Sequence, residues 1–328
     1  MKRNIPFLIS FLFFQASLNA QNTLKDTVKI NAVSIESKLQ QEQLHQLDSI
    51  DLNNPQHLNL GDLLAKKSHL FVKSYGIGSL ATVSLRGSGS SHTQLYWNGI
   101  SINSSMNGSS DLSLFPLFFM DQVKLNYGLK SITDGTGGIG GAINFSSKPS
   151  FKKQQQVEFS SIFGSFGQRQ YTGKFVVGNT KIQSQTKLYF NEAENNFNYK
   201  DLTQEGFPDR EVRNASLEQK GLLQSLYYRP KESLLLEAQI WFFDSKRNLP
   251  PLITLRENSE FQEDRSTRAI VGFHKYWEGS KLSVKTSFLN DVLSYKNERA
   301  SVNTKSETKS YRSRVDYVLD VSKKVNVT

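Results

Sequence analysis

The second half of the chain alternates apolar and polar residues with a period of two. Val157, Phe159 and Phe163 fall on one side of an extended chain, whereas Glu158 and Ser160 fall on the other. This period is typical of β-strands, whose successive side chains point to opposite faces. We expect about eight strands of roughly nine to thirteen residues beyond the Lys148-Pro149 pair. The runs are 157–163, 170–177, and approximately 180–191, 217–229, 233–244, 266–277, 281–291 and 311–319.

The connections between these runs differ in length. Residues 164–167, 178–179 and 229–232 are short turns, whereas 192–216 and 245–265 are long, polar and charged. Strands of about ten residues, with loops that are long at one end and short at the other, are typical of an outer-membrane β-barrel. A soluble β-sandwich is the alternative, but its strands are usually nearer five or six residues long. The pattern therefore favours the barrel.

The chain before Lys148 has shorter apolar runs separated by glycine, serine and asparagine. We expect a compact α+β region there, with a two-residue turn at Asn98-Gly99 joining two strands. Its expected elements are a helical turn at 60–65, a strand from Phe71, strands at 95–97, 100–102, 123–127 and 142–145, and a helix at 111–120 with Pro116 near its first turn. The polar stretch 36–54 is interpreted as a short helix or a tether.

A G-x-G-x-x-G match occurs at Gly135, Gly137 and Gly140. A dinucleotide site needs a helix directly after the glycines, because the helix N-terminus receives the pyrophosphate. Here a β-run, 142–145, follows instead. The glycines are therefore interpreted as tight turns and as places where strands approach closely.

Catalytic patterns are absent from the sequence. The five histidines are isolated, no pair has metal-binding spacing, and no G-x-S-x-G motif occurs. His92 alone lies in a loop of small polar residues, Ser88–Thr93, where its side chain could face a ligand. We therefore expect that the protein is not an enzyme and has no cofactor.

The N-terminus has the order of a secretory signal peptide. Lys2 and Arg3 precede the apolar run 5–14, and small residues lead to a cleavage site after Ala20. A short buried helix is the alternative. The chain has no cysteine, which excludes disulfides and a lipidated N-terminal cysteine. An exported, β-rich protein without cysteine fits the periplasm or outer membrane of a Gram-negative bacterium.

The formal net charge is +10. Lysine and arginine are scattered singly or in pairs, without the interleaved aromatic residues or longer basic runs of a nucleic-acid site. We interpret the excess as solvated surface or loop charge and expect no nucleic-acid partner.

An extended, β-prone segment follows the expected cleavage site. It consists of Asp26, Thr27, Val28, Lys29, Ile30, Asn31, Ala32 and Val33. The residues alone leave two interpretations open: an ordinary first strand, or a strand that adds to the sheet edge of another protein.

Four segments together resemble the TonB-dependent outer-membrane receptors, and among them the cobalamin receptor branch. Residues 26–33 resemble the energy-coupling box, 83–103 (VSLRGSGSSHTQLYWNGISIN) a plug motif, 108–116 (GSSDLSLFP) a cobalamin-branch segment, and 134–148 (DGTGGIGGAINFSSK) the glycine motif that closes the plug. The chain departs from the family at Asn98, where aspartate is usual, and at 121–129, where an acidic–basic pattern and a Gly-Pro pair are missing.

The resemblance implies the fold and its divisions. We expect a signal peptide at 1–20, the TonB box and arm at 21–35, an α+β plug at 36–150, and at 151–328 the N-terminal portion of a transmembrane antiparallel β-barrel of about 22 strands. Because the last strand would have no partner on one side, we also expect that the sequence is the front portion of a longer one.

The resemblance also implies the site and the function. The box, Asp26–Val33, would pair with the periplasmic TonB protein, and ligand would bind at the plug tips. The candidate ligand-binding residues are Ser90, Ser91, His92, Asn107, Ser109 and Ser110. The favoured function is import of a scarce ligand of the cobalamin type. A ferric-siderophore receptor and a surface binding or adhesion barrel without transport are the alternatives.

The expected surroundings follow from the same resemblance. The protein would lie in outer-membrane lipid as a monomer, with a surface lipoprotein as an optional partner. The acidic loop residues Asp201, Glu205 and Asp209 offer hard oxygen ligands for a calcium ion, although solvated loop charge is the favoured interpretation.

Overall fold

A computed structural model describes residues 44–47, 52, 58–76, 78–85, 87–127, 140–251, 259–322 and 325–327. Residues from Ser37 onward belong to one compact unit. The expected signal peptide, the TonB box at Asp26–Val33, and Gly135 and Gly137 of the glycine motif lie outside the described residues. Within the described part of the chain, no helix is both long enough and apolar enough to span a membrane.

A five-stranded sheet, called the small sheet below, organises the first half of the chain. Its strand order is β1-β6-β7-β4-β5, in which β4 and β7 are parallel and the other neighbours are antiparallel. The strands are β1 (Leu44–Leu47), β4 (Thr93–Trp97), β5 (Ile100–Ser101), β6 (Gln122–Asn126) and β7 (Gly141–Ser146). The expected strands near 95, 123 and 142 are confirmed, and β7 confirms that a strand, not a helix, follows the glycines. β1 lies within the stretch interpreted as a helix or a tether.

One short helix and a two-stranded sheet accompany the small sheet. The helix α3 (Leu60–Lys67) begins at Asn59, whose side-chain oxygen accepts a hydrogen bond from the Asp62 backbone N–H at 3.0 Å. Leu60, Leu63 and Leu64 form its buried face. Strands β2 (Phe71–Ser74) and β3 (Ala81–Ser84) pair with each other in an antiparallel manner. The expected helical turn at 60–65 and the strand from Phe71 are therefore confirmed.

The expected turn at Asn98-Gly99 joins β4 to β5. Asn98 has φ of 50° and Gly99 has φ of 84°, so both central residues adopt the left-handed conformation that a tight hairpin turn requires. Asparagine and glycine tolerate this region best, which is why the dipeptide predicted the turn.

The expected helix at 111–120 is wrong. The segment forms two 3₁₀ turns, η2 (Leu112–Leu114) and η3 (Leu117–Phe119), separated by Phe115 and Pro116. Pro116 has no backbone N–H and disfavours helical geometry at the preceding residue, and Phe115 is extended with φ of −119° and ψ of 90°. A proline in the middle of the segment therefore divides it rather than starting a helix.

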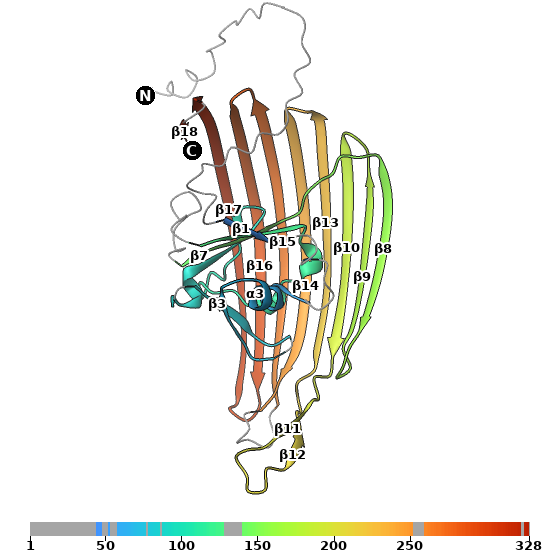
Figure 1. Cartoon of the computed structure of the whole chain (residues 1–328), viewed down its shortest axis with the longest axis vertical. Helices are drawn as coiled ribbons and strands as arrows, with labels where there is room; N and C mark the ends of the chain where they lie inside the picture. Colours follow the sequence, from blue (N-terminus) through green and yellow to red (C-terminus); the bar gives the residue numbers. More distant parts are fainter. Residues whose placement is uncertain are drawn as a thin grey trace, which may run out of the picture. The chain divides into compact units, whose positions relative to one another are not determined.

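A nine-stranded antiparallel sheet, called the large sheet below, forms the second half (Figure 1). Its order is β18-β17-β16-β15-β14-β13-β10-β9-β8. The strands are β8 (Gln154–Phe163), β9 (Arg169–Gly178), β10 (Ile182–Ala193), β13 (Leu217–Lys231), β14 (Leu234–Leu249), β15 (Glu260–Trp277), β16 (Ser280–Asn297), β17 (Val302–Ser322) and β18 (Val325–Val327). The expected strands are present, but several are longer than predicted, up to 21 residues in β17. Strand pairing continues through polar residues that were assigned to loops.

Connections at the two ends of the large sheet differ in length as expected, except that 164–168 and 298–301 are short and lie at the same end as the long ones. Residues 179–181, 232–233 and 278–279 make the short turns. The opposite end carries the long connections 194–216 and 250–259, and it is called the loop end below. The first of them contains a small hairpin of β11 (Asn198–Lys200) and β12 (Asp209–Glu211), seen at the lower end of Figure 1.

The two faces of the large sheet have opposite polarity. Its outer face exposes apolar side chains such as Phe159, 74% exposed, and Tyr311, 80% exposed. Its inner face buries polar residues such as Gln185 and Lys187 against the small sheet and its loops. An apolar outside with a polar inside is the reverse of a soluble sandwich and is characteristic of a transmembrane barrel.

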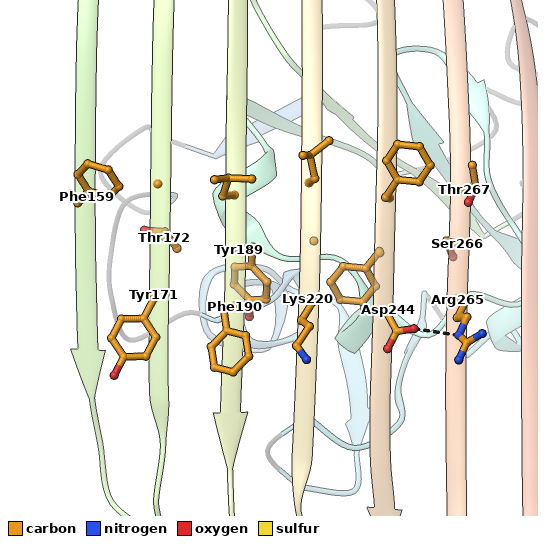
Figure 2. A pocket seen from close by; sticks show the side chains of 16 residues that line it. Phe159, Tyr171, Thr172, Tyr189, Phe190, Lys220, Asp244, Arg265, Ser266 and Thr267 are labelled. Atoms are coloured by element: carbon orange, nitrogen blue, oxygen red, sulfur yellow. Dashed lines mark hydrogen bonds and ion pairs between the residues drawn. The ribbon is translucent and has the colours of Figure 1, made fainter.

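Part of the outer face is hollowed. Apolar and aromatic side chains line a hollow of about 640 Å³, and Lys220, Asp244 and Arg265 form a charged row along it (Figure 2). Asp244 Oδ2 and Arg265 Nε lie 3.0 Å apart. Charged residues on the outer face therefore pair with one another across neighbouring strands.

Candidate functional site

The inner face of the large sheet holds the small sheet through an aromatic cluster. Trp241 on β14 is fully buried. Its ring centroid lies 5.3 Å from that of Trp97, 5.5 Å from Phe119, 5.8 Å from Phe115 and 6.0 Å from Phe145. All four pairs have steep interplanar angles, the edge-to-face geometry that aromatic rings prefer. One side chain of the large sheet thus contacts β4, β7, the turn η3 and the Phe115 ring between the two 3₁₀ turns.

Two glycines allow the close approach. Gly221 on β13 faces inward, and a Cβ built there would lie 2.8 Å from the Phe119 ring. Gly78 has φ of +68°, and a Cβ built there would lie 2.1 Å from the Leu217 side chain. Any larger residue at either position would collide across the junction of the two sheets.

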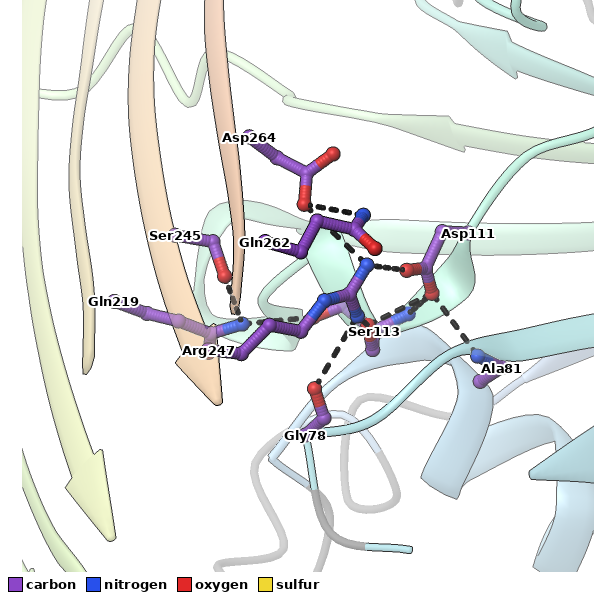
Figure 3. Close-up of polar contacts among 9 residues, drawn as sticks. All are labelled: Gly78, Ala81, Asp111, Ser113, Gln219, Ser245, Arg247, Gln262 and Asp264. Carbon is purple, nitrogen blue, oxygen red and sulfur yellow. Dashed lines mark hydrogen bonds and ion pairs between the residues drawn. The ribbon is translucent and has the colours of Figure 1, made fainter. Parts of the chain in front are cut away.

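A buried guanidinium joins the two sheets near the loop end (Figure 3). Arg247 on β14 donates through Nη2 to Asp111 Oδ2 at 2.7 Å and to Asp264 Oδ2 at 3.3 Å. Its Nη1 donates to Ser113 Oγ at 3.2 Å and to the Gly78 carbonyl at 3.4 Å. Only 3% of the Arg247 side chain is exposed, so the charge is held almost wholly by these partners.

Asp111 also orders the loop to which it belongs. Its Oδ1 accepts hydrogen bonds from the Ala81 N–H at 3.0 Å, the Ser113 N–H at 3.0 Å and the Ser113 hydroxyl at 2.7 Å. The carboxylate therefore has three donors from the small sheet's own loops besides Arg247. Hydrogen bonds to an ionised acceptor are stronger than those between neutral groups.

The Asn98-Gly99 turn docks on the large sheet through its amide side chain. Asn98 Nδ2 donates to Gln239 Oε1 at 2.8 Å, and Asn98 Oδ1 accepts from the Ser147 N–H at 3.1 Å. Lys285 Nζ donates to the Asn98 carbonyl at 2.7 Å. An asparagine uses both a donor and an acceptor here, which an aspartate could not do. This accounts for the departure from the family pattern at position 98.

Further cations of the large sheet face the small sheet. Lys187 Nζ lies 2.6 Å from Asp121 Oδ1, and Arg312 donates to the Asn103 carbonyl at 3.3 Å and to Ser105 Oγ at 3.1 Å. Lys187 is 2% exposed and Arg247 is 3% exposed. The interpretation of the basic excess as solvated charge is therefore wrong for these residues, which bind carboxylate, carbonyl and hydroxyl oxygens in the loops of the small sheet.

The first group of predicted ligand-binding residues forms one structural element. Ser90, Ser91 and His92 make up the 3₁₀ turn η1 (Ser90–His92), directly before β4. The His92 ring Nδ1 accepts a hydrogen bond from the Gly89 N–H at 3.3 Å, and the His92 side chain is exposed. The turn therefore presents an imidazole whose second ring nitrogen faces solvent.

The second group lies on the loop 103–110. Asn107 is exposed, and its Oδ1 accepts hydrogen bonds from both the Ser109 N–H and the Ser109 hydroxyl at 3.1 Å. Asn103 fastens this loop to β4, because its side chain accepts from the Leu95 N–H at 2.7 Å and donates to the Gly108 carbonyl at 2.8 Å. Ser110 is half-buried beside Asp111.

The structure brings these two groups together. A Cβ built on Gly108 would lie 3.3 Å from the Ser91 Cβ, so the turn and the loop abut. Ser105 Oγ lies 3.2 Å from Ser310 Oγ, and Met106 contacts Ser306 near the loop end of β17. The predicted tips thus face the end of the large sheet that carries the long connections.

One exposed residue of the tips was not predicted from the sequence. Met106 lies within the loop 103–110 and is 67% exposed. It belongs to no recognisable motif. Its exposure marks it as a candidate, and that exposure is known only from the fold.

One of the candidate calcium ligands, Asp201, has another role in the structure. Asp201 Oδ2 pairs with Arg210 Nε at 2.9 Å, and Asp201 Oδ1 accepts from the Thr203 hydroxyl at 2.5 Å. The Thr203 hydrogen bond, together with the Arg210 charge, lowers the pKa of Asp201. No group of three or more histidine and acidic side chains that could hold a metal occurs among the described residues.

Comparison with known families and proteins gives a family model and a curated relative of the same class. The family model described as the TonB-dependent Receptor Plug Domain matches residues 39–142. A segment of 74 residues is 34% identical to the vitamin B12 transporter BtuB of Vibrio vulnificus (strain YJ016). That alignment covers 23% of this chain and 12% of the relative.

Solved structures match both sheets. The FrpB iron transporter from Neisseria meningitidis superposes with a TM-score of 0.69 at 12% identity, over 86% of this chain and 47% of that one. The siderophore receptor PiuA from Acinetobacter baumannii gives 0.65 at 13% identity, over 84% and 42%. The copper transporter OprC gives 0.59 at 12% identity, over 86% and 54%. The chain therefore spans about half the length of these structures and shares their fold.

Proposed function

We propose that this chain, which belongs to the TonB-dependent outer-membrane receptors, takes up a scarce small-molecule ligand across the outer membrane. Members of this family are receptors and transporters, not enzymes. The observation that carries the proposal is the position of the plug, here the small sheet with its loops. It is seated on the polar inner face of an antiparallel wall, the large sheet, whose outer face is apolar. A plug in this position would block a pore, so uptake would require its movement.

The proposed ligand is of the cobalamin type. The support is local, namely a segment of 74 residues over which the chain is 34% identical to a vitamin B12 transporter. The segment 108–116, whose resemblance pointed to the same branch, begins at Gly108, which abuts Ser91 of the turn η1. A ferric siderophore remains the alternative cargo, because fold likeness at 11–14% identity does not distinguish ligands.

The proposed binding surface consists of the plug tips at the loop end. Ser90, Ser91 and His92 offer hydroxyls and an imidazole, and Asn107 and Ser109 offer an amide and a hydroxyl. These groups give hydrogen bonds in a fixed geometry, since η1 and the loop 103–110 are held to β4 and to each other. Hydrogen-bonding groups on an ordered scaffold are what orient a polar ligand.

The proposed energy input is mechanical. The TonB box, Asp26–Val33, would add as a strand to the periplasmic domain of the TonB protein, by backbone pairing to an exposed sheet edge. A pull on this segment would then reach the plug through the chain that leads to β1.

An uptake assay tests the proposal. The full-length protein would be expressed in a Gram-negative strain that lacks its own cobalamin and siderophore receptors. Uptake of radiolabelled cyanocobalamin is expected, with no uptake of a ferric siderophore. Deletion of residues 26–33 should abolish uptake and leave binding of the label to cells unchanged. Uptake of the siderophore alone would show that the ligand is a ferric siderophore and not cobalamin. Binding without uptake by the intact protein would support a surface binding protein instead.

A further inference from the structure

Arg247 lies between two carboxylates that belong to different parts of the molecule. Asp111 is on the plug, whereas Asp264 is on β15 of the wall, the strand next to that of Arg247. The same nitrogen, Nη2, is 2.7 Å from the plug carboxylate and 3.3 Å from the wall carboxylate (Figure 3). One cation is therefore shared by two anions, and the shorter contact crosses the junction between plug and wall.

Each side of this junction keeps partners of its own. If the plug moves away, Asp111 retains the Ala81 N–H and the Ser113 N–H and hydroxyl, which move with it. Asp264 stays beside Arg247 on the wall and is held in place by the Gln262 side chain at 2.9 Å. Removing one partner of a buried ion pair is strongly unfavourable because it leaves an uncompensated charge. The arrangement at Arg247 avoids that outcome on both sides.

A second ion pair across the junction lacks this feature. Lys187 of the wall is 2.6 Å from Asp121 of the plug, and only 3% of its side chain is exposed. Among the described residues, Asp121 is the one carboxylate within ion-pair distance of Lys187. Withdrawal of the plug at this point would strand the ammonium group. The two ion pairs therefore oppose plug movement to different extents.

We propose that Asp264 is a second carboxylate partner for Arg247. When the plug is withdrawn, the Arg247 guanidinium loses Asp111 of the plug and keeps Asp264 of the wall. The inference rests on the proposed function in one respect, namely that the plug moves. Asp111 strengthens the seated state, because it contributes its contact to Arg247 only there. Asp264 stabilises the withdrawn state more than the seated state, because only in the withdrawn state is it the sole carboxylate on Arg247. The two aspartates, although both bound to one arginine, should have opposite effects on release.

Force spectroscopy on the full-length protein in a lipid bilayer tests this directly. The protein is pulled from its N-terminal end, and the lifetime of the seated plug is measured at constant force. Asp111→Asn should shorten the lifetime about tenfold, because the seated state loses its strongest contact to Arg247. Asp264→Asn should lengthen the lifetime about tenfold, because withdrawal then leaves Arg247 without a carboxylate.

Two controls make the result specific. Asp244→Asn removes the same charge from the outer face of β14, where Asp244 pairs with Arg265, and should leave the lifetime unchanged. In an Arg247→Met background, Asp264→Asn should no longer lengthen the lifetime. A lifetime that is unchanged or shorter in Asp264→Asn would overturn the inference. Because the measurement needs neither ligand nor TonB, absence of uptake would count against the proposed function and not against this result.

Discussion

Trp241 is the residue whose loss should weaken the seating of the plug most. It is fully buried and packs edge-to-face against four aromatic rings of the plug, those of Trp97, Phe115, Phe119 and Phe145. We expect Trp241→Ala to leave the barrel wall folded, because the strand pairing of β14 with β13 and β15 is unaffected, and to loosen the plug upon it.

The magnitude follows from the burial of the side chain. Truncation of a buried tryptophan to alanine costs about 3–5 kcal/mol, from the lost transfer of apolar surface and the cavity that remains. Because about 1.4 kcal/mol corresponds to a factor of ten, opening of the plug from the wall should become at least about a hundredfold more frequent.

Hydrogen exchange of the plug amides measures this opening. Amides of β4 (Thr93–Trp97) should lose about two to three orders of magnitude of protection in Trp241→Ala. Trp241→Phe keeps a ring in the cluster and should lose much less. The matched control is Phe242→Ala on the next residue of β14, which faces outward at 47% exposure and should not change protection in the plug. Equal protection of β4 in Trp241→Ala and the unchanged protein would refute the reasoning.

Three other predictions concern the glycine contact, the loop carboxylate and the tip histidine. Gly221→Val should destabilise plug seating by about 1–3 kcal/mol in the same exchange assay, since its side chain would meet the η3 phenyl ring, whereas Gly173→Ala on the outer face should not. The lowered pKa of Asp201 means that its contribution to loop order is complete above the usual aspartate pKa of about 3.9 and is lost as the pH falls through the lowered folded-state pKa. At about pH 5 pepsin should therefore cut the loop 194–216 faster in Asp201→Asn than in the unchanged protein, and the difference should narrow as the pH falls toward about 2. His92→Ala should weaken equilibrium binding of cyanocobalamin to the purified protein about tenfold, whereas His69→Ala, an equally exposed histidine away from the tips, should leave it unchanged.

Much of the local structure could be predicted because local chemistry decides it. Asn98-Gly99 makes its turn since both residues accept positive φ, and the period-two runs form strands since no other structure places alternate residues on one face. The loop residues around Asp201 were expected to be polar and are, but their pairing with Arg210 depends on the β11–β12 hairpin. Composition alone does not specify that pairing.

The junction between plug and wall could not be predicted, because it depends on contacts between residues far apart in the sequence. Trp241 is one of many aromatic residues in alternating strands, and its neighbour Phe242 faces outward. A shift of one residue in the strand phase would exchange the two. The role of Arg247 was equally hidden, since its partner Asp111 lies 136 positions away. The resemblance located the tips, but the packing of Gly108 against Ser91 appeared only in the fold.

The polar and the apolar contacts at the junction between plug and wall should resist withdrawal of the plug to different extents. Apart from the ion pairs of Arg247 and Lys187, cations of the wall, among them those of Lys285 and Arg312, face backbone carbonyls of the plug. Water that enters on separation can hydrogen-bond to all of these groups, so the net cost of each broken contact is modest. The aromatic cluster around Trp241 is different, because water offers no substitute for apolar packing. Resistance to withdrawal should therefore be concentrated at Trp241 and at Lys187, whose charge would be stranded, while the remaining contacts fix the position of the plug.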